Sequence, residues 1–146
     1  MEYNVKRLKS NETETALDLV MKVFMEYEAP DYTEEGVEEF KKTMQDEDYL
    51  SKLCMYGAFA DERLIGVIAT RSEGTHVALF FVDSDFHRKG VGRSLFQTVL
   101  ADCDSDRITV NSSPYAVPVY KKLGFTETDT EQVVNGLRFT PMEYKF

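Results

Sequence analysis

The segment from Thr75 to Ala101 constrains the fold more than any other part of the chain. An apolar run rich in β-branched and aromatic residues (75–82) precedes a polar loop (83–89), and apolar residues at helical spacing follow (90–101). This order predicts a buried strand, a tight loop and an amphipathic helix. Glycines stand at the start of this helix, where backbone N–H groups are unpaired, so an anion such as a phosphate can approach the backbone closely.

Three cations surround this expected anion site in a chain that is otherwise strongly acidic. Arg88, Lys89 and Arg93 flank the glycines, whereas the formal net charge of the chain is −9. Two known phosphate-binding patterns are excluded. The P-loop pattern Gly-x-x-x-x-Gly-Lys-Ser/Thr is absent, and Leu95 replaces the third glycine of the dinucleotide fingerprint Gly-x-Gly-x-x-Gly.

Size and composition limit the remaining possibilities. The 146 residues are enough for one domain, 1–146, with its own core. The N-terminus lacks an apolar signal region and no run approaches the roughly 20 apolar residues of a membrane helix, so we expect a cytoplasmic protein that does not bind membranes. The negative charge argues against a nucleic-acid partner. Cys54 and Cys103 lack metal-ligand spacing, so we expect reduced thiols and no metal.

Hydrophobic periodicity predicts an α/β (α+β) fold, with a mixed, mostly antiparallel sheet of about seven strands flanked by about four helices. A helix is expected from Asn11 or Thr13 to Pro30, a second begins at Thr33, and a short helical piece follows near Leu50. The last helix ends at Gly124, and its Pro118 is tolerated only in a first turn. Strands are expected at 3–9, 55–60, 64–70, 75–82, 107–111, 125–128, 131–134 and 137–144, with a tight hairpin at Asn135-Gly136.

Two motifs in the second half of the chain are similar to those of a known family. The first, F-F-V-D-S-D-F-H-R-K-G-V-G-R-S-L-F, resembles the acetyl-CoA motif of the GNAT superfamily of N-acetyltransferases, usually Arg/Gln-x-x-Gly-x-Gly/Ala after a strand. The second, I-T-V-N-S-S-P-Y-A-V-P-V-Y-K-K-L-G-F, resembles the strand and helix that follow in that family. The two motifs stand in the family's order, and the resemblance extends over essentially the whole chain.

The resemblance implies direct transfer of an acetyl group from acetyl-CoA to a primary amine in a ternary complex, with a small-molecule amine as the expected partner. In the family the fourth strand is splayed from the fifth, so its end can pair with the pantetheine arm of the cofactor. Two positions depart from the family pattern, since His87 replaces Arg or Gln and Ser113 replaces a common Asn. The implied cofactor contacts are Phe81, Val82, His87, Arg88, Lys89, Gly90, Val91, Gly92, Arg93, Ser94, Ser113 and Ala116.

Two residues are implied as catalytic. Tyr120 matches the family tyrosine that protonates the leaving thiolate, and a phenol has the donor that this role requires. His76 lies near the position where several family members place a base, and a histidine titrates in the useful range. Glu26 and Glu28, near the end of the first helix, are alternatives for the base, although we expect them on a solvent-exposed helix face.

Two other functions remain open from the sequence. One is a non-catalytic module of the same fold that binds acyl-CoA, as a sensor or an interaction subunit. The other is a protein or peptide N-acetyltransferase, whose acceptor groove would lie between the first helices and the last hairpin. The resemblance also allows a homodimer formed through the C-terminal strands. The sequence does not choose the acceptor, because loops on one fold carry different specificities.

Overall fold

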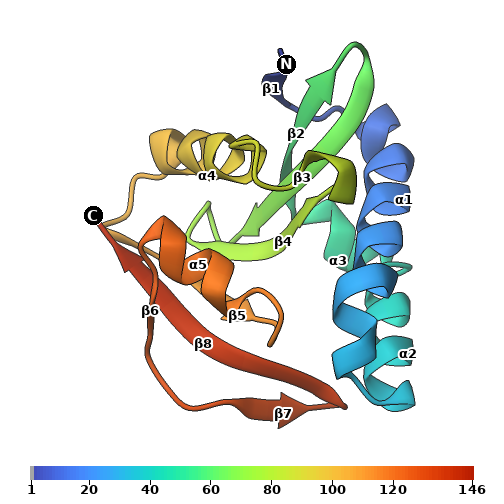
Figure 1. Cartoon of the computed structure of the whole chain (residues 1–146), viewed down its shortest axis with the longest axis vertical. Coiled ribbons are helices and arrows are strands. Elements are labelled where there is room, and N and C mark those ends of the chain that lie inside the picture. The colour runs from blue at the N-terminus through green and yellow to red at the C-terminus, as the bar shows by residue number, and fades with distance from the viewer. Residues whose placement is uncertain (1) are drawn as a thin grey trace.

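The computed structural model describes residues 2–146 and places an eight-stranded sheet between two layers of helices (Figure 1). The strand order is β1-β2-β3-β4-β5-β8-β6, and β7 pairs with β8. The strands are β1 (Asn4–Arg7), β2 (Cys54–Ala60), β3 (Arg63–Arg71), β4 (His76–Val82), β5 (Arg107–Ser112), β6 (Thr126–Glu127), β7 (Gln132–Val134) and β8 (Leu137–Lys145). The helices are α1 (Thr13–Val23), α2 (Glu34–Thr43), α3 (Glu47–Ser51), α4 (Val91–Asp102) and α5 (Val117–Leu123). The predicted fold class is confirmed.

Each face of the sheet is covered by its own pair of helices. Helices α1 and α2 lie on one face, and α4 and α5 lie on the other (Figure 1). Strand β4 contributes to both apolar cores, because side chains alternate along a strand. Leu79 and Phe81 pack in the core under α1, whereas Phe80 and Val82 pack against the core under α4.

Strand β4 has an irregularity that separates it from β5. Ala78 is an extra residue between the two positions of β4 that pair with Ala69 and Thr70 of β3, which is a β-bulge. The parallel pairing of β4 with β5 is limited to two residue pairs, at His76 and Val77. Both strands continue past this point without pairing each other, so they splay apart.

The first helix is less regular than the sequence pattern predicts. After α1 the chain forms a π-helical turn at Phe24–Glu28 and a 3-10 turn at Ala29–Asp31. Thr33 then caps α2 as predicted, because its side chain accepts a hydrogen bond from the Gly36 N–H at 3.3 Å. A π-helical turn frequently occurs at a functional site.

The last helix agrees with the prediction from its proline and glycine. Helix α5 begins at Val117, with Pro118 in its first turn, where the missing N–H is no loss. Gly124 ends it in a left-handed conformation with φ of 111°.

Three further features concern membranes, thiols and metals. None of the helices over residues 2–146 is both long and apolar enough to cross a membrane. Cys54 and Cys103 are free, partly buried thiols. In the described part of the chain, no three His, Cys, Asp or Glu side chains are grouped so that they could hold a metal ion.

Helix α2 touches the β7–β8 hairpin through two glycines. A Cβ atom built on Gly36 would lie 2.2 Å from the carbonyl oxygen of Gly136, which is far inside van der Waals contact. Gly136 itself has φ of 79° in the hairpin turn. The hairpin therefore reaches α2 only because neither contact residue carries a side chain.

Substitution of Gly36 by alanine should destabilise the protein by about 1 to 3 kcal/mol, because the added methyl group overlaps the Gly136 backbone. Without that overlap, alanine would stabilise the helix by roughly 0.8–1.0 kcal/mol. Urea denaturation measures the difference, and Glu38→Ala, at an exposed position of the same helix, is the control. A Gly36→Ala protein more stable than the wild type would contradict the observed contact.

Candidate active site

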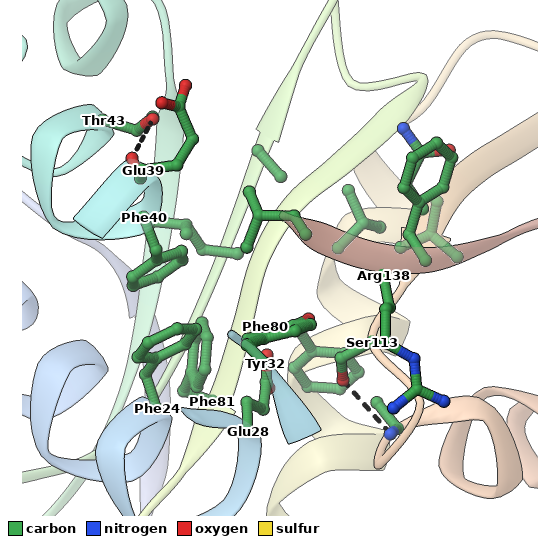
Figure 2. A pocket seen from close by; sticks show the side chains of 18 of the residues that line it. Phe24, Glu28, Tyr32, Glu39, Phe40, Thr43, Phe80, Phe81, Ser113 and Arg138 are labelled. Carbon is green, nitrogen blue, oxygen red and sulfur yellow. Dashed lines mark hydrogen bonds between the residues drawn. The ribbon is translucent and has the colours of Figure 1, made fainter. Parts of the chain in front are cut away.

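A pocket of about 440 Å³ lies where β4 separates from β5 (Figure 2). Its walls come from the segment from Phe24 through α2, Tyr49 of α3, strands β4 and β5, the residues between Ser113 and Tyr120, and the β7–β8 hairpin. This volume is within the usual range of about 300–1,000 Å³ for small-molecule sites. The splay of the two strands thus creates a cavity that a fully paired sheet could not contain.

Tyr120 lies in the wall of this pocket, as expected for a catalytic residue. It is 5% exposed, and its ring packs against the rings of Phe80 and Phe125 at centroid distances of 5.8 and 5.2 Å. Burial, and then the negative charge of Glu28, raises the pKa of Tyr120 well above its usual value. The phenol therefore stays protonated and keeps a proton to donate.

Glu28 is also in the pocket wall, and the expectation that it lies on a solvent-exposed helix face is wrong. Burial raises the pKa of the Glu28 carboxyl to about 7, an effect that a hydrogen bond with Ser113 opposes and the nearby Asp31 reinforces. Glu26 is exposed, in agreement with the expectation for that residue. A carboxyl with a pKa near 7 can accept or release a proton under neutral conditions.

The spacing of inward-facing residues contains the signal that identifies Glu28. Val20 and Phe24 are both fully buried, and Glu28 continues the same four-residue spacing. Residues four apart share one face of a helix, so this spacing points Glu28 to the interior. The charge of Glu28 favours a solvent-exposed position, whereas this spacing favours an inward-facing one.

His76 lies outside the pocket. Its Nδ1 atom is 2.8 Å from the Thr109 hydroxyl, where β4 and β5 are still paired. Burial, and then the positive charge of Arg71, lowers the pKa of His76 to about 4. The geometry therefore favours Glu28 over His76 as the residue that accepts a proton from a pocket ligand.

The backbone groups on the free edge of β4 differ in part from those of the predicted pair, Phe81 and Val82. The Asp83 N–H donates to the Ile65 carbonyl of β3 at 2.8 Å. Backbone groups alternate in direction along an antiparallel strand, so those of Phe81 also face β3, and those of Phe80 and Val82 face the open side. The Val82 carbonyl already accepts a hydrogen bond from His87 Nε2 at 2.7 Å. Phe80 is therefore a better candidate than Phe81 for pairing with an extended ligand.

The loop before α4 provides the expected anion site at the end of this edge. Gly90, with φ of 83°, is the N-cap of α4, and no side chain caps the helix. Arg88 and Lys89 are exposed, and within the described residues neither forms an ion pair. The N–H groups of the first helical turn, including those of Val91 and Gly92, are therefore available to an anion, with two cations nearby.

Buried Asp83 holds the start of this loop in place. Its carboxylate accepts hydrogen bonds from Lys22 at 3.2 Å, Arg63 at 3.1 Å and the Asp85 N–H at 3.0 Å. Burial alone would raise the pKa of Asp83, but these partners outweigh it and hold the pKa below its usual value. The end of β4 is thereby tied to both α1 and β3.

The other predicted cofactor residues have protein partners. Arg93 donates to the Lys122 carbonyl at 3.3 Å, and the Ser94 hydroxyl lies 2.8 Å from that of Tyr3. Ser113 accepts a hydrogen bond from the Ala116 N–H at 3.2 Å, and both residues line the pocket. Ser113 thus fixes the turn before α5 and also meets Glu28.

The fold is shared with solved acetyltransferases. The whole chain superposes on a GCN5-related N-acetyltransferase from Rhodopseudomonas palustris, with a TM-score of 0.86, 18% identity and 97% of that chain covered. It also superposes on PaiA N-acetyltransferase from Thermoplasma acidophilum, solved in complex with coenzyme A, with a TM-score of 0.80, 21% identity and 100% of both chains covered. FeeM, an N-acyl amino acid synthase from uncultured soil microbes, gives a TM-score of 0.73 at 18% identity, over 99% of this chain and 91% of that one. No curated protein matches the chain in sequence.

These similarities show that the chain has the fold of the acetyltransferases. The sequence also matches the family described as acetyltransferase (GNAT) domain over residues 28–146. The chain belongs to the GNAT acetyltransferase family, as its two motifs indicate.

Substitution of Glu28 by glutamine should stabilise the protein at pH 8 by about 2 to 3 kcal/mol and have little effect near pH 4.5. The folded state holds the Glu28 proton up to about pH 7, whereas the unfolded state releases it near the ordinary pKa of 4.5. The wild type therefore loses stability as the pH rises between these values, and glutamine does not titrate. Urea denaturation at both pH values measures the effect, and the exposed Glu26→Gln is the control. Equal pH dependence in the two variants would contradict the burial of Glu28.

Proposed function

We propose that the protein is an N-acetyltransferase that transfers the acetyl group of acetyl-CoA directly to a primary amine in a ternary complex. The observation that carries the proposal is the position of Glu28 and Tyr120 in one pocket, beside the free edge of β4. One residue can take a proton and the other can give one. An amine acylation requires both of these transfers.

The residues of the loop and strand edge fit acetyl-CoA. The uncapped start of α4 at Gly90, with Arg88 and Lys89, suits the pyrophosphate, and the open side of Phe80 and Val82 suits the amide groups of the pantetheine arm. The PaiA structure in complex with coenzyme A supports this choice of thioester. When bound, acetyl-CoA supplies the activated acetyl group.

Glu28 is the proposed proton acceptor. An alkyl amine has a pKa near ~10.4, so only roughly one molecule in a thousand is neutral at pH 7. A carboxyl with a pKa of about 7 accepts a proton at the working pH and so maintains a neutral nucleophile. Holding the amine beside the thioester adds the rate advantage of proximity.

Tyr120 is the proposed proton donor. The C–N bond forms, the C–S bond breaks, and the phenol proton passes to the thiolate as it leaves. The attacking nitrogen gives its surplus N–H proton to Glu28, and this proton restores the phenol afterwards, so the transfer from a neutral amine neither consumes nor releases a proton. The raised pKa of Tyr120 ensures that the proton is present at the start.

Acetyl-CoA-dependent thiol release tests the proposal directly. Tyr120→Phe should lower kcat by about 10²-fold or more without changing the affinity for acetyl-CoA. Glu28→Gln should lower kcat similarly and should abolish the rise in rate that the wild type shows as the pH passes about 7. His76→Gln, outside the pocket, is the matched control with a nearly unchanged rate. Loss of activity in His76→Gln with full activity in Glu28→Gln would reverse the assignment of the base.

Substitution of Gly90 by glutamate should reduce acetyl-CoA affinity at least about tenfold, because a carboxylate then stands where the pyrophosphate must bind. Gly74→Glu is the control, since Gly74 has a similar φ of 85° and nothing within 4 Å of an added Cβ atom. Calorimetric titration compares the two variants at equal charge and equal backbone strain. Equal affinities would mean that the phosphates bind elsewhere.

A further inference from the structure

Several aromatic rings of the pocket wall pack against one another. The rings of Phe24 and Phe40 stack at a centroid distance of 3.8 Å and an angle of 6°. Tyr32 stacks on Phe24 at 5.8 Å, and Phe81 meets Phe40 edge-on at 6.2 Å (Figure 2). The rings belong to Phe24 of the π-helical turn, Tyr32 before α2, Phe40 of α2 and Phe81 of β4. Tyr32 and Phe40 are partly exposed and present their surface to the pocket, whereas Phe24 and Phe81 are buried against them. Such a wall favours a ligand with a flat, apolar body.

The pocket does not provide an available cation for a carboxylate on the acceptor. Among the described residues 2–146, Arg138 is the one lysine or arginine that lines the pocket. Its guanidinium donates to both carboxylate oxygens of Glu131, at 3.3 and 3.1 Å, and to the Asp31 carbonyl at 3.1 Å. The carboxylate of an amino acid placed in this pocket would have to compete with these partners for Arg138, so the pocket favours an amine without a carboxylate.

The two acidic residues of the pocket differ in their surroundings. Glu28 lines the pocket together with Ser113 and Tyr120, so it marks the end of the pocket where the proposed transfer places the acceptor nitrogen. Glu39 lies on α2, and its carboxylate points away from the rings of Phe24 and Phe40 (Figure 2). A molecule that fills the pocket therefore meets one carboxyl at the reacting end and rings along its body.

We propose that the acceptor is an arylalkylamine: a primary amine on a short chain that ends in an aromatic ring and carries no carboxylate. The ring lies against the aromatic wall, and the amine nitrogen lies beside Glu28. This inference rests on the proposed acetyl transfer and specifies its substrate.

The test compares amines that differ in one feature at a time, with acetyl-CoA and the wild-type protein. 2-Phenylethylamine and n-butylamine differ in the ring, 2-phenylethylamine and L-phenylalanine differ in the carboxylate, and spermidine carries additional cations in place of the ring. The value of kcat/KM should be at least about tenfold higher for 2-phenylethylamine than for each of the other three.

Variants of the aromatic wall, which is formed by Phe24, Tyr32, Phe40 and Phe81, provide a second test of the same inference. Phe40→Leu should lower kcat/KM for 2-phenylethylamine about tenfold and leave the value for n-butylamine within about threefold. Tyr32→Leu, at a partly exposed ring, serves the same purpose if Phe40→Leu does not fold. Circular dichroism verifies that each variant is folded.

The outcomes separate this inference from the proposed function. A preference for spermidine, for n-butylamine or for L-phenylalanine would overturn the substrate class while acetyl transfer stands. An equal loss of kcat/KM for 2-phenylethylamine and n-butylamine in the wall variants would also overturn the substrate class. If no amine releases thiol although acetyl-CoA binds, the proposed function fails and the substrate inference fails with it.

Discussion

The separation of β4 from β5 is the constraint on which the rest of the structure depends. The strands share only two residue pairs, whereas β3 pairs with β4 and β8 pairs with β5 over most of their length. The sheet therefore stays continuous while a gap opens in its middle. The bulge at Ala78 begins that gap, since an extra residue bends a strand and increases its twist. The edge of β4 and the pocket both result from it.

The exposed charges of the loop before α4 are opposite in sign to the net charge of the protein. The chain carries −9 overall, yet the loop before α4 exposes Arg88 and Lys89. Asp83, the acidic residue at the base of the loop, is buried and neutralised by Lys22 and Arg63. Glu28 is an opposite case, because burial without a cation raises its pKa and reduces stability at neutral pH.

Most of the fold could be predicted from the sequence, because its signals are local. The strand, loop and helix of residues 75–101, the cap at Thr33 and the helix end at Gly124 each follow from the chemistry of a few neighbouring residues. The π-helical turn at Phe24–Glu28 could not be predicted in this way, since no proline or glycine marks its beginning. Its effect on Glu28 depends on how the segment packs against β4.

Only part of the candidate site could be predicted, because only some of its residues belong to local motifs. Tyr120 and the glycines of the loop belong to motifs with fixed spacing, and the structure places them beside the pocket and at the start of α4. His76 and Phe81 were implied by the family resemblance, which does not reveal the bulge at Ala78 or the direction in which the groups on either side of it point. The hydrogen bond from His87 to the Val82 carbonyl could not be predicted either, because it depends on the folded path of the loop and not on the spacing of residues in the sequence.

The contact between His87 and Val82 has a thermodynamic consequence for any ligand amide that pairs with this edge. A carbonyl only accepts, so His87 Nε2 carries the proton of this 2.7 Å hydrogen bond. The Val82 oxygen has two lone pairs, so an incoming amide can either share this oxygen with the imidazole or replace the imidazole. Replacement exchanges one hydrogen bond for another, and the net gain in free energy from that contact is small. Pairing of a ligand with Val82 would therefore contribute more to the alignment of the ligand than to its affinity.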